Sequence, residues 1–360
     1  MALISPGRRT CGTMEQHTRM LEAEPVYRAN RLTIERFSLE RARVALRAAA
    51  PRTITIPVVV HVLYSTAAEN ISEEQVRSQI AVLNQDFQRK NPDRSQTPAP
   101  FRGAIGNPKV RFQLAVRDPN GSPTNGITRT PTTKPQFDSG ANDIKFTAQG
   151  GRDAWPRDRY LNLWVGGTVV DPVVGALLGY AQFPGGPAAT DGVVIAATGF
   201  GTQGTAQAPF NKGRTATHEI GHWLNLLHIW GDDNGGCQGS DNVADTPNQA
   251  GPNSGCPSFP HRTCQNGPHG DMFMNYMDYT DDACMFMFTK GQVARMRTTL
   301  QGPRATILAS DALAPAARVA RLALPTRAPK ASLATLVGAE AGSQVTTVFD
   351  GAGWVQVGAR

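Results

Sequence analysis

Two histidines and a glutamate, in the run from His218 to His222, have the spacing of a metal-activated hydrolytic site. Residues four apart on an α-helix project from one face, about 6 Å apart along the axis. The imidazoles of His218 and His222 can therefore bind one zinc ion, and Glu219 can reach a water molecule on that ion. Such a short motif also arises by chance on amphipathic helices, so a second feature is needed.

His228 supplies that feature, six residues after His222. On a continuing helix it would lie too far away, so the chain must first turn sharply. Asn225 stands at this point, and asparagine tolerates the left-handed conformation that ends helices. Three neutral nitrogens and one open position describe a catalytic zinc site, which lowers the pKa of its water from about 16 to about 7. Glu219 is the predicted general base, taking a proton from the attacking water and passing it to the leaving amine.

The extended motif resembles the metzincin metallopeptidases, and Asn225 in place of the usual glycine resembles their pappalysin branch. A second run, Asn-Tyr-Met-Asp-Tyr at residues 275–279, is similar to the methionine turn of that family. The resemblance, from about Thr53 to Leu308, implies an α+β domain with a twisted, mostly parallel sheet, helices above an active-site cleft, and an irregular disulfide-bonded lower subdomain. It implies that Met277 packs beneath the ligands and that Tyr279 hydrogen-bonds the oxyanion. The alternative for Tyr279 is a buried structural role.

Four of the five cysteines crowd near this segment: Cys237, Cys256, Cys264 and Cys284. They contain no CxxC pair, so disulfides are favoured over a second zinc site, with three pairings open. The resemblance implies Cys237 with Cys264 and Cys256 with Cys284. Disulfides indicate an oxidising compartment, so we expect secretion, although no apolar run after Met1 is long enough for a signal peptide. Either the start is truncated or export uses another route.

Cys11 stands apart, ahead of a segment with helical patterning at residues 12–50, where Thr13 and Gln16 predict a capping box. We interpret residues 1–51 as a propeptide whose Cys11 thiolate fills the open zinc position and keeps the enzyme latent. A free or intermolecularly paired cysteine is the alternative. Cleavage near Pro51 and Arg52 would release a catalytic domain of residues 52–305. Residues 306–360 read as a Pro- and Ala-rich linker with a short C-terminal extension containing two strand-like runs.

The loop after the metal motif is rich in the oxygen donors that calcium prefers, and Asx turns are the alternative explanation. Its donors are Asp232, Asp233, Asn234, Asp241, Asn242, Asp245 and Thr246. The resemblance supports calcium, with Asp241 and Thr246 as the expected ligands. It also suggests a preference for Arg or Lys after the scissile bond, which would suit self-cleavage before Arg52. Four acids near the methionine turn are candidates for that pocket: Asp271, Asp278, Asp281 and Asp282.

The elements that position these residues are read from hydrophobic periodicity. Strands are expected at 54–64, 110–116, 161–169, 177–183 and 192–197, with His61 as a core histidine. Helices are expected after a Ser72–Gln75 capping box, through the metal motif from Thr215 or Thr217, and from Thr289 to Leu300. The run 178–184 resembles the edge strand that holds substrate antiparallel in this family, where main-chain pairing gives affinity with little sequence preference.

Charge and composition exclude other classes. The net charge of +7 lies on the flanks: residues 1–52 carry +5, residues 303–360 carry +3, and the part between carries −1. Nucleic acid is therefore not an expected partner, and no run approaches a membrane span. We expect a monomeric zinc endopeptidase acting on protein or peptide substrates. The intact Glu219 disfavours the alternative of a secreted binding protein without catalysis. His228 disfavours a hydrolase in which a distant glutamate is the third zinc ligand.

Overall fold

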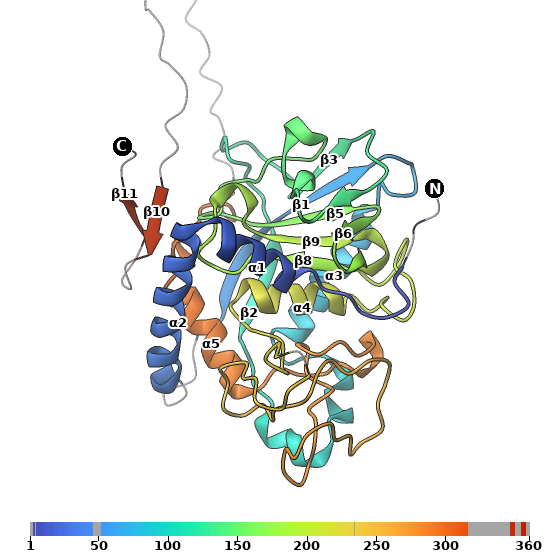
Figure 1. Ribbon diagram of the computed structural model, residues 1–360. Coiled ribbons are helices and arrows are strands. Elements are labelled where there is room, and N and C mark those ends of the chain that lie inside the picture. Colours follow the sequence, from blue (N-terminus) through green and yellow to red (C-terminus); the bar gives the residue numbers. More distant parts are fainter. Residues whose placement is uncertain are drawn as a thin grey trace, which may run out of the picture.

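The computed structural model describes residues 3, 5–45, 52–233, 235–315, 346–349 and 354–357. Within these residues, the main sheet has the order β2-β1-β5-β9-β8, and β3 pairs with β1 (Figure 1). Every neighbouring pair is parallel except β8 with β9. The mostly parallel sheet is therefore confirmed, with its antiparallel strand at one edge. The strands are β1 (Ile54–Tyr64), β2 (Val110–Leu114), β3 (Ile127–Pro131), β5 (Leu161–Gly166), β8 (Gly179–Ala181) and β9 (Val193–Ala196).

Helices α3 (Glu73–Asp86) and α4 (Arg214–Trp223) enclose the main core with one face of this sheet. Ser72 caps α3 by accepting from the main-chain nitrogen of Gln75 at 3.1 Å. The Gln75 side chain instead donates to the carbonyl of Phe200, so only half of the expected capping box forms. Helix α5 (Lys290–Gln301) completes the core and begins with a full capping box between Thr289 and Gln292.

A smaller sheet of order β4-β6-β7 contributes to a second core: β4 (Phe137–Asp138), β6 (Val169–Asp171) and β7 (Gly175–Leu177). The strand expected at 161–169 therefore ends at Gly166, and the one expected at 177–183 is divided between β7 and β8. His61 is buried, with its ring nitrogens 2.8 Å from Thr128 and 3.0 Å from Asn162, which confirms a core histidine.

Short 3-10 helices fill several connections, including the interval 91–108. They are η1 (Pro92–Gln96), η2 (Ala99–Ala104), η3 (Asp143–Lys145), η4 (Thr147–Gln149), η5 (Ala188–Thr190), η6 (Ala197–Gly199), η7 (Asp282–Cys284) and η8 (Ala305–Ala309).

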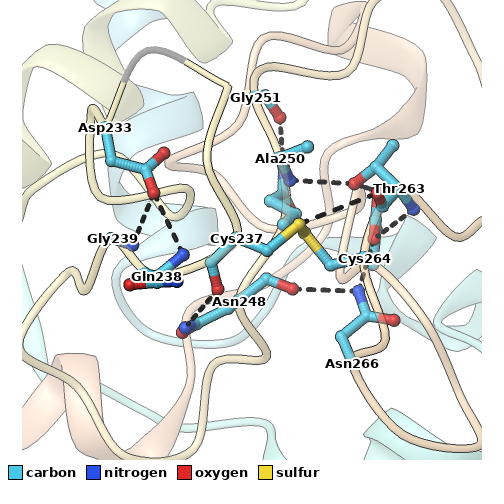
Figure 2. Close-up of a disulfide and its surroundings, with 12 residues drawn as sticks. Asp233, Cys237, Gln238, Gly239, Asn248, Ala250, Gly251, Thr263, Cys264 and Asn266 are labelled. Atoms are coloured by element: carbon cyan, nitrogen blue, oxygen red, sulfur yellow. Dashed lines mark hydrogen bonds between the residues drawn. A yellow bond between two sulfur atoms is a disulfide. The ribbon is translucent and has the colours of Figure 1, made fainter.

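The lower part of the domain, between α4 and α5, is mostly irregular and is cross-linked by two disulfides (Figure 1). Cys237 pairs with Cys264, and Cys256 pairs with Cys284, as the family resemblance implied. Figure 2 shows the first bridge beside Thr263, whose hydroxyl accepts from the main-chain nitrogen of Ala250 at 3.0 Å. The bridges hold together loops that have little regular hydrogen bonding of their own.

The N-terminal segment forms two helices that lie against the rest of the chain (Figure 1). α1 (Thr13–Ala23) contacts β8, and α2 (Pro25–Ala45) packs on α5. The helical patterning is confirmed, but the capping box at Thr13 is wrong: Gly12 is the N-cap and gives no side-chain cap. Pro51 lies outside the described residues, so the expected boundary there has no structural description.

At the other end, packing continues past residue 305. Ala312 is buried in a cluster with Val59 and Trp155, and its carbonyl accepts from the main-chain nitrogen of Val116 at 2.9 Å. The linker from residue 316 to 345 lies outside the described residues. Beyond it, β10 (Thr346–Phe349) and β11 (Trp354–Val357) pair antiparallel, as their sequence pattern predicted. Among the described helices, none has the length and apolarity needed to cross a membrane.

Candidate metal centre

The chain reverses directly after α4. The helix ends at Trp223, and Asn225 adopts a left-handed conformation with φ of 74°. The main-chain nitrogen of Leu226 then bonds back to the carbonyl of Gly221 at 2.9 Å. This is the turn predicted from the histidine spacing, and it brings His228 to the other two histidines.

Three imidazoles converge through their Nε2 atoms. Nε2 of His222 lies 3.2 Å from that of His218 and 3.1 Å from that of His228. Each Nδ1 faces an oxygen acceptor: the carbonyls of Tyr276 at 2.7 Å and Leu226 at 2.8 Å, and the Asp232 carboxylate at 2.7 Å. The protons therefore belong on Nδ1, and three lone pairs face one another. Such an arrangement requires a cation between them, and imidazole nitrogen suits zinc.

Burial favours the neutral form of these ligands. Desolvation, followed by the neighbouring imidazoles, holds the pKa of His218 and of His222 well below the usual value. Metal binding needs neutral imidazole, so both side chains are in the required state at neutral pH.

Cys11 brings a fourth ligand atom to the same place. Its sulfur and the three histidine nitrogens all lie within 4.8 Å of one another. Its neighbours pair with the edge strand: Gly12 donates to the carbonyl of Gly179, and Leu178 donates to that of Thr10, both at 3.0 Å. This pairing is parallel, opposite in direction to the antiparallel pairing expected for a substrate. The N-terminal segment therefore pairs with the edge strand that was predicted to hold substrate, and it runs in the direction opposite to that predicted for substrate.

Glu219 is buried next to the same segment. Its Oε2 accepts from the Thr13 hydroxyl at 2.9 Å and lies 3.4 Å from the Cys11 sulfur. The Thr13 oxygen also accepts from the main-chain nitrogen of Ala181 at 2.8 Å, which explains why it does not cap α1. Burial raises the pKa of Glu219 to about 7, although the hydrogen bonds from Thr13 and Cys11 act to lower it.

The methionine turn lies beneath and beside the histidines. Met277 is fully buried, and a Cβ at Gly221 would come within 2.4 Å of its sulfur, so this glycine makes room for it under α4. The Tyr279 ring lies 5.0 Å from the His228 ring, and its hydroxyl donates to the carbonyl of Cys11 at 3.4 Å. A cavity of about 730 Å³ adjoins His228 and Tyr279 and extends under α1.

Among the described side chains of the N-terminal segment, a basic one forms an ion pair with one of the four candidate acids. Asp282 forms a buried ion pair with Arg9 at 2.5 Å. Arg9 also donates to the carbonyl of Thr280 at 3.1 Å, and its guanidinium lies 5.1 Å above the Phe210 ring. Asp278 accepts instead from Asn253 and Gln249, and Asp271 from Thr263 and Asn266. Asp281 is only partly buried. The sequence alone did not predict a role for Arg9. The signal that could have revealed one is its position two residues before Cys11.

The oxygen donors of the loop after α4 have separate partners. Asp232 bonds to His228, a role that the sequence did not reveal, and Asp245 accepts from Thr289 and Gly291 at the start of α5. Asp233 accepts from the main chain of Gln238 and Gly239 (Figure 2). Asn234 lies outside the described residues.

Asp241 and Thr246 lie together, with both Asp241 carboxylate oxygens 2.9 Å from the Thr246 hydroxyl. Burial raises the pKa of Asp241 to about 7. The two expected calcium ligands are therefore neighbours in a buried site.

Known proteins share this architecture. The family model described as pregnancy-associated plasma protein-A, peptidase M43, matches residues 146–301. An extracellular metalloprotease of Verticillium alfalfae is 34% identical over 309 residues, covering 83% of this chain and 91% of that protein. A promirolysin mutant of Tannerella forsythia is 49% identical with a TM-score of 0.74, covering 84% of this chain and 98% of that one. Mature mirolysin in complex with a cleaved peptide is 55% identical with a TM-score of 0.69, covering 72% and 97%.

Proposed function

The chain belongs to the pappalysin-like metzincins and is a zinc-dependent metalloendopeptidase; we propose that it is exported in a latent form that its own N-terminal segment blocks. The observation that carries this proposal is the convergence of Cys11 with the three histidines within 4.8 Å. The relatives named extracellular metalloproteases and the two disulfides support export.

We assign His218, His222 and His228 as the zinc ligands and Glu219 as the general base. Zinc held there would lower the pKa of water and polarise a peptide carbonyl. Glu219 takes the proton of the attacking water and delivers it to the leaving amine. Tyr279, beside the ligands, donates its hydroxyl to the oxyanion. Met277 supports α4 from below and has no chemical role.

Latency follows from the position of Cys11. A thiolate at the fourth position excludes water, and the Thr13 hydroxyl occupies Glu219 at the same time. We propose residues 1–51 as the propeptide, 52–305 as the catalytic core with its packing extended to Ala312, and the rest as a C-terminal extension. The greater coverage of this chain by the precursor neighbour than by the mature one, 84% against 72%, supports a removable segment.

We infer a preference for Arg or Lys after the scissile bond, and the position of Asp282 supports it. Arg9 pairs with this buried carboxylate two residues before the Cys11 position. A basic substrate side chain that entered the same pocket would find the same partner. Cleavage of the Pro51–Arg52 bond by the enzyme itself would be consistent with that preference.

We also propose one calcium ion at Asp241 and Thr246, because their oxygens lie 2.9 Å apart in a buried site and are donors that calcium prefers. Protein and peptide substrates are the only partners that we propose, and the chain is expected to act as a monomer.

The test uses the full-length protein, its zinc content and its initial rate on a fluorogenic peptide. We expect one zinc per chain. Glu219→Ala should retain zinc but should not turn over the peptide. Cys11→Ala should cleave the peptide from the start of the assay, at the rate that the parent reaches only after its N-terminal segment has been removed. Glu40→Gln, an exposed carboxylate of α2, is the matched control. A full-length parent as active as the processed enzyme would contradict latency, and parent-level turnover by Glu219→Ala would contradict the general base.

A further inference from the structure

Helix α2 contacts the catalytic domain through a buried charge far from Cys11 in the sequence. Arg295 of α5 is 1% exposed and donates to both carboxylate oxygens of Glu35, at 2.7 and 2.6 Å. Its Nε donates to the carbonyl of Asn225 at 2.5 Å. The guanidinium is thus fixed by the catalytic domain on one side and neutralised by α2 on the other.

Both polar atoms of the Asn225 side chain form hydrogen bonds with α2. Its Oδ1 accepts from Arg31 at 2.7 Å, and its Nδ2 donates to the hydroxyl of Ser38 at 3.3 Å. Arg31 also pairs with Glu35 at 2.7 Å, one helical turn away. The left-handed turn at Asn225 would form equally well with glycine, so the turn does not require this carboxamide. Binding α2 does require it.

The surface beside Arg295 is shaped for an aromatic side chain of α2. A Cβ at Gly302 would come within 2.3 Å of the Phe37 ring, and all three of its nearest atoms belong to Phe37. The missing side chain at Gly302 therefore accommodates this ring.

We propose that Asn225, Arg295 and Gly302 form a receptor for helix α2, and that this receptor anchors α2 independently of Cys11. Its ligand is the Arg31–Glu35 pair with Phe37. The inference rests on the proposed latency and attributes it to two separable contacts: Cys11 at the histidines, and α2 at the receptor. Loss of Glu35 would leave Arg295 buried without a counter-charge, so α2 would detach while residues 9–13 stayed in the cleft.

The test is hydrogen exchange of the full chain carrying Glu219→Ala, which prevents self-cleavage. Glu35→Gln, Asn225→Gly and Gly302→Ala should each speed amide exchange in residues 26–41 at least tenfold. The amides of Gly12 and Ala181 should remain protected. Glu40→Gln and Gly103→Ala are matched controls, since Glu40 is exposed and a Cβ at Gly103 meets nothing within 4 Å.

Cys11→Ala in the same background separates the two contacts and should leave α2 protected. Parent-like exchange of α2 in all three receptor variants would overturn the proposal, as would release of α2 by Cys11→Ala alone. The measurement requires no catalysis, so a failure of the peptidase assignment would not change it. Zinc content is measured alongside, because its loss in Asn225→Gly would mean that the turn itself had changed.

Discussion

The carboxylate of Asp232 accepts a hydrogen bond from Nδ1 of His228 at 2.7 Å. This contact fixes the proton on Nδ1 and leaves Nε2 free to bind metal. Carboxylates that hold a ligating histidine in this way raise its basicity and orient its ring. The other two histidines have main-chain carbonyls in this position, so His228 is the one of the three proposed ligands whose orientation depends on a replaceable side chain.

Asp232→Ala should therefore weaken zinc binding by about 10- to 100-fold. The measurement is competition with a chelator of known affinity on the full-length protein carrying Glu219→Ala. Asp158→Ala, on an exposed carboxylate, should leave the zinc affinity unchanged. Unchanged affinity in Asp232→Ala would show that the ring is held by packing against Trp230, which stacks on it at 4.3 Å.

Tyr279→Phe should lower kcat by about 100-fold with little change in KM, because its hydroxyl acts only on the charge that develops in the transition state. Steady-state rates of the processed enzyme give both constants. Tyr64→Phe serves as the control, since Tyr64 lies on β1 away from the histidines. Parent-level kcat in Tyr279→Phe would support the purely structural role for this tyrosine.

Asp282→Asn should reduce the preference for arginine over leucine after the scissile bond by at least tenfold. Asparagine retains an oxygen that can accept from the main-chain nitrogens of Lys212 and Arg214, so the loop should keep its shape. Paired peptides that differ at this one position give the ratio of kcat/KM. If the ratio is the same in Asp282→Asn and in the control Asp281→Asn, another group selects the basic residue.

Calcium should raise the Tm of the parent, because an ion that binds only the folded state stabilises it. Asp241→Ala should abolish this increase, whereas Asp153→Ala, at an exposed site, should retain it. Thermal unfolding with millimolar calcium, after removal of tightly bound ions with a weak chelator, measures the difference. An equal calcium response in Asp241→Ala would refute the proposed ligand.

Lys145 predicts a pH dependence of stability. It is buried, donates to the carbonyl of Thr190 at 2.8 Å, and burial lowers its pKa to about 7. The unfolded value is about 10.4, so between pH 7 and 10 the unfolded chain binds more protons and stability rises with pH. Below pH 7 the destabilisation from burying the charge is fully present.

Lys145→Met should therefore be more stable than the parent at pH 7. Between pH 7 and 9, its free energy of unfolding should rise by about 2 kcal/mol less than that of the parent. Urea unfolding of chains carrying Glu219→Ala measures both quantities. Lys90→Met, on an exposed lysine, should keep the parental slope. Parallel pH profiles for the parent and Lys145→Met would show that Lys145 titrates near its ordinary pKa in the folded chain.

The sequence determined the parts of the site that depend on local geometry. Histidines four apart must share a helical face, and an asparagine in a left-handed turn returns the chain for His228. The mostly parallel sheet and the two disulfide pairings came from family resemblance, because alternation and cysteine count alone leave several arrangements open.

Only the tertiary structure decided which distant groups meet. Arg9 and Asp282 are 273 positions apart, and Glu35 and Arg295 are 260 apart, so no periodicity relates them. Among four similar acids, Arg9 meets Asp282 because the fold brings that carboxylate, which also accepts from the main-chain nitrogens of Lys212 and Arg214, to the N-terminal segment. Thr13 has the sequence context of a cap, yet its hydroxyl bonds to Glu219, because packing of α1 against β8 brings it to a buried carboxylate.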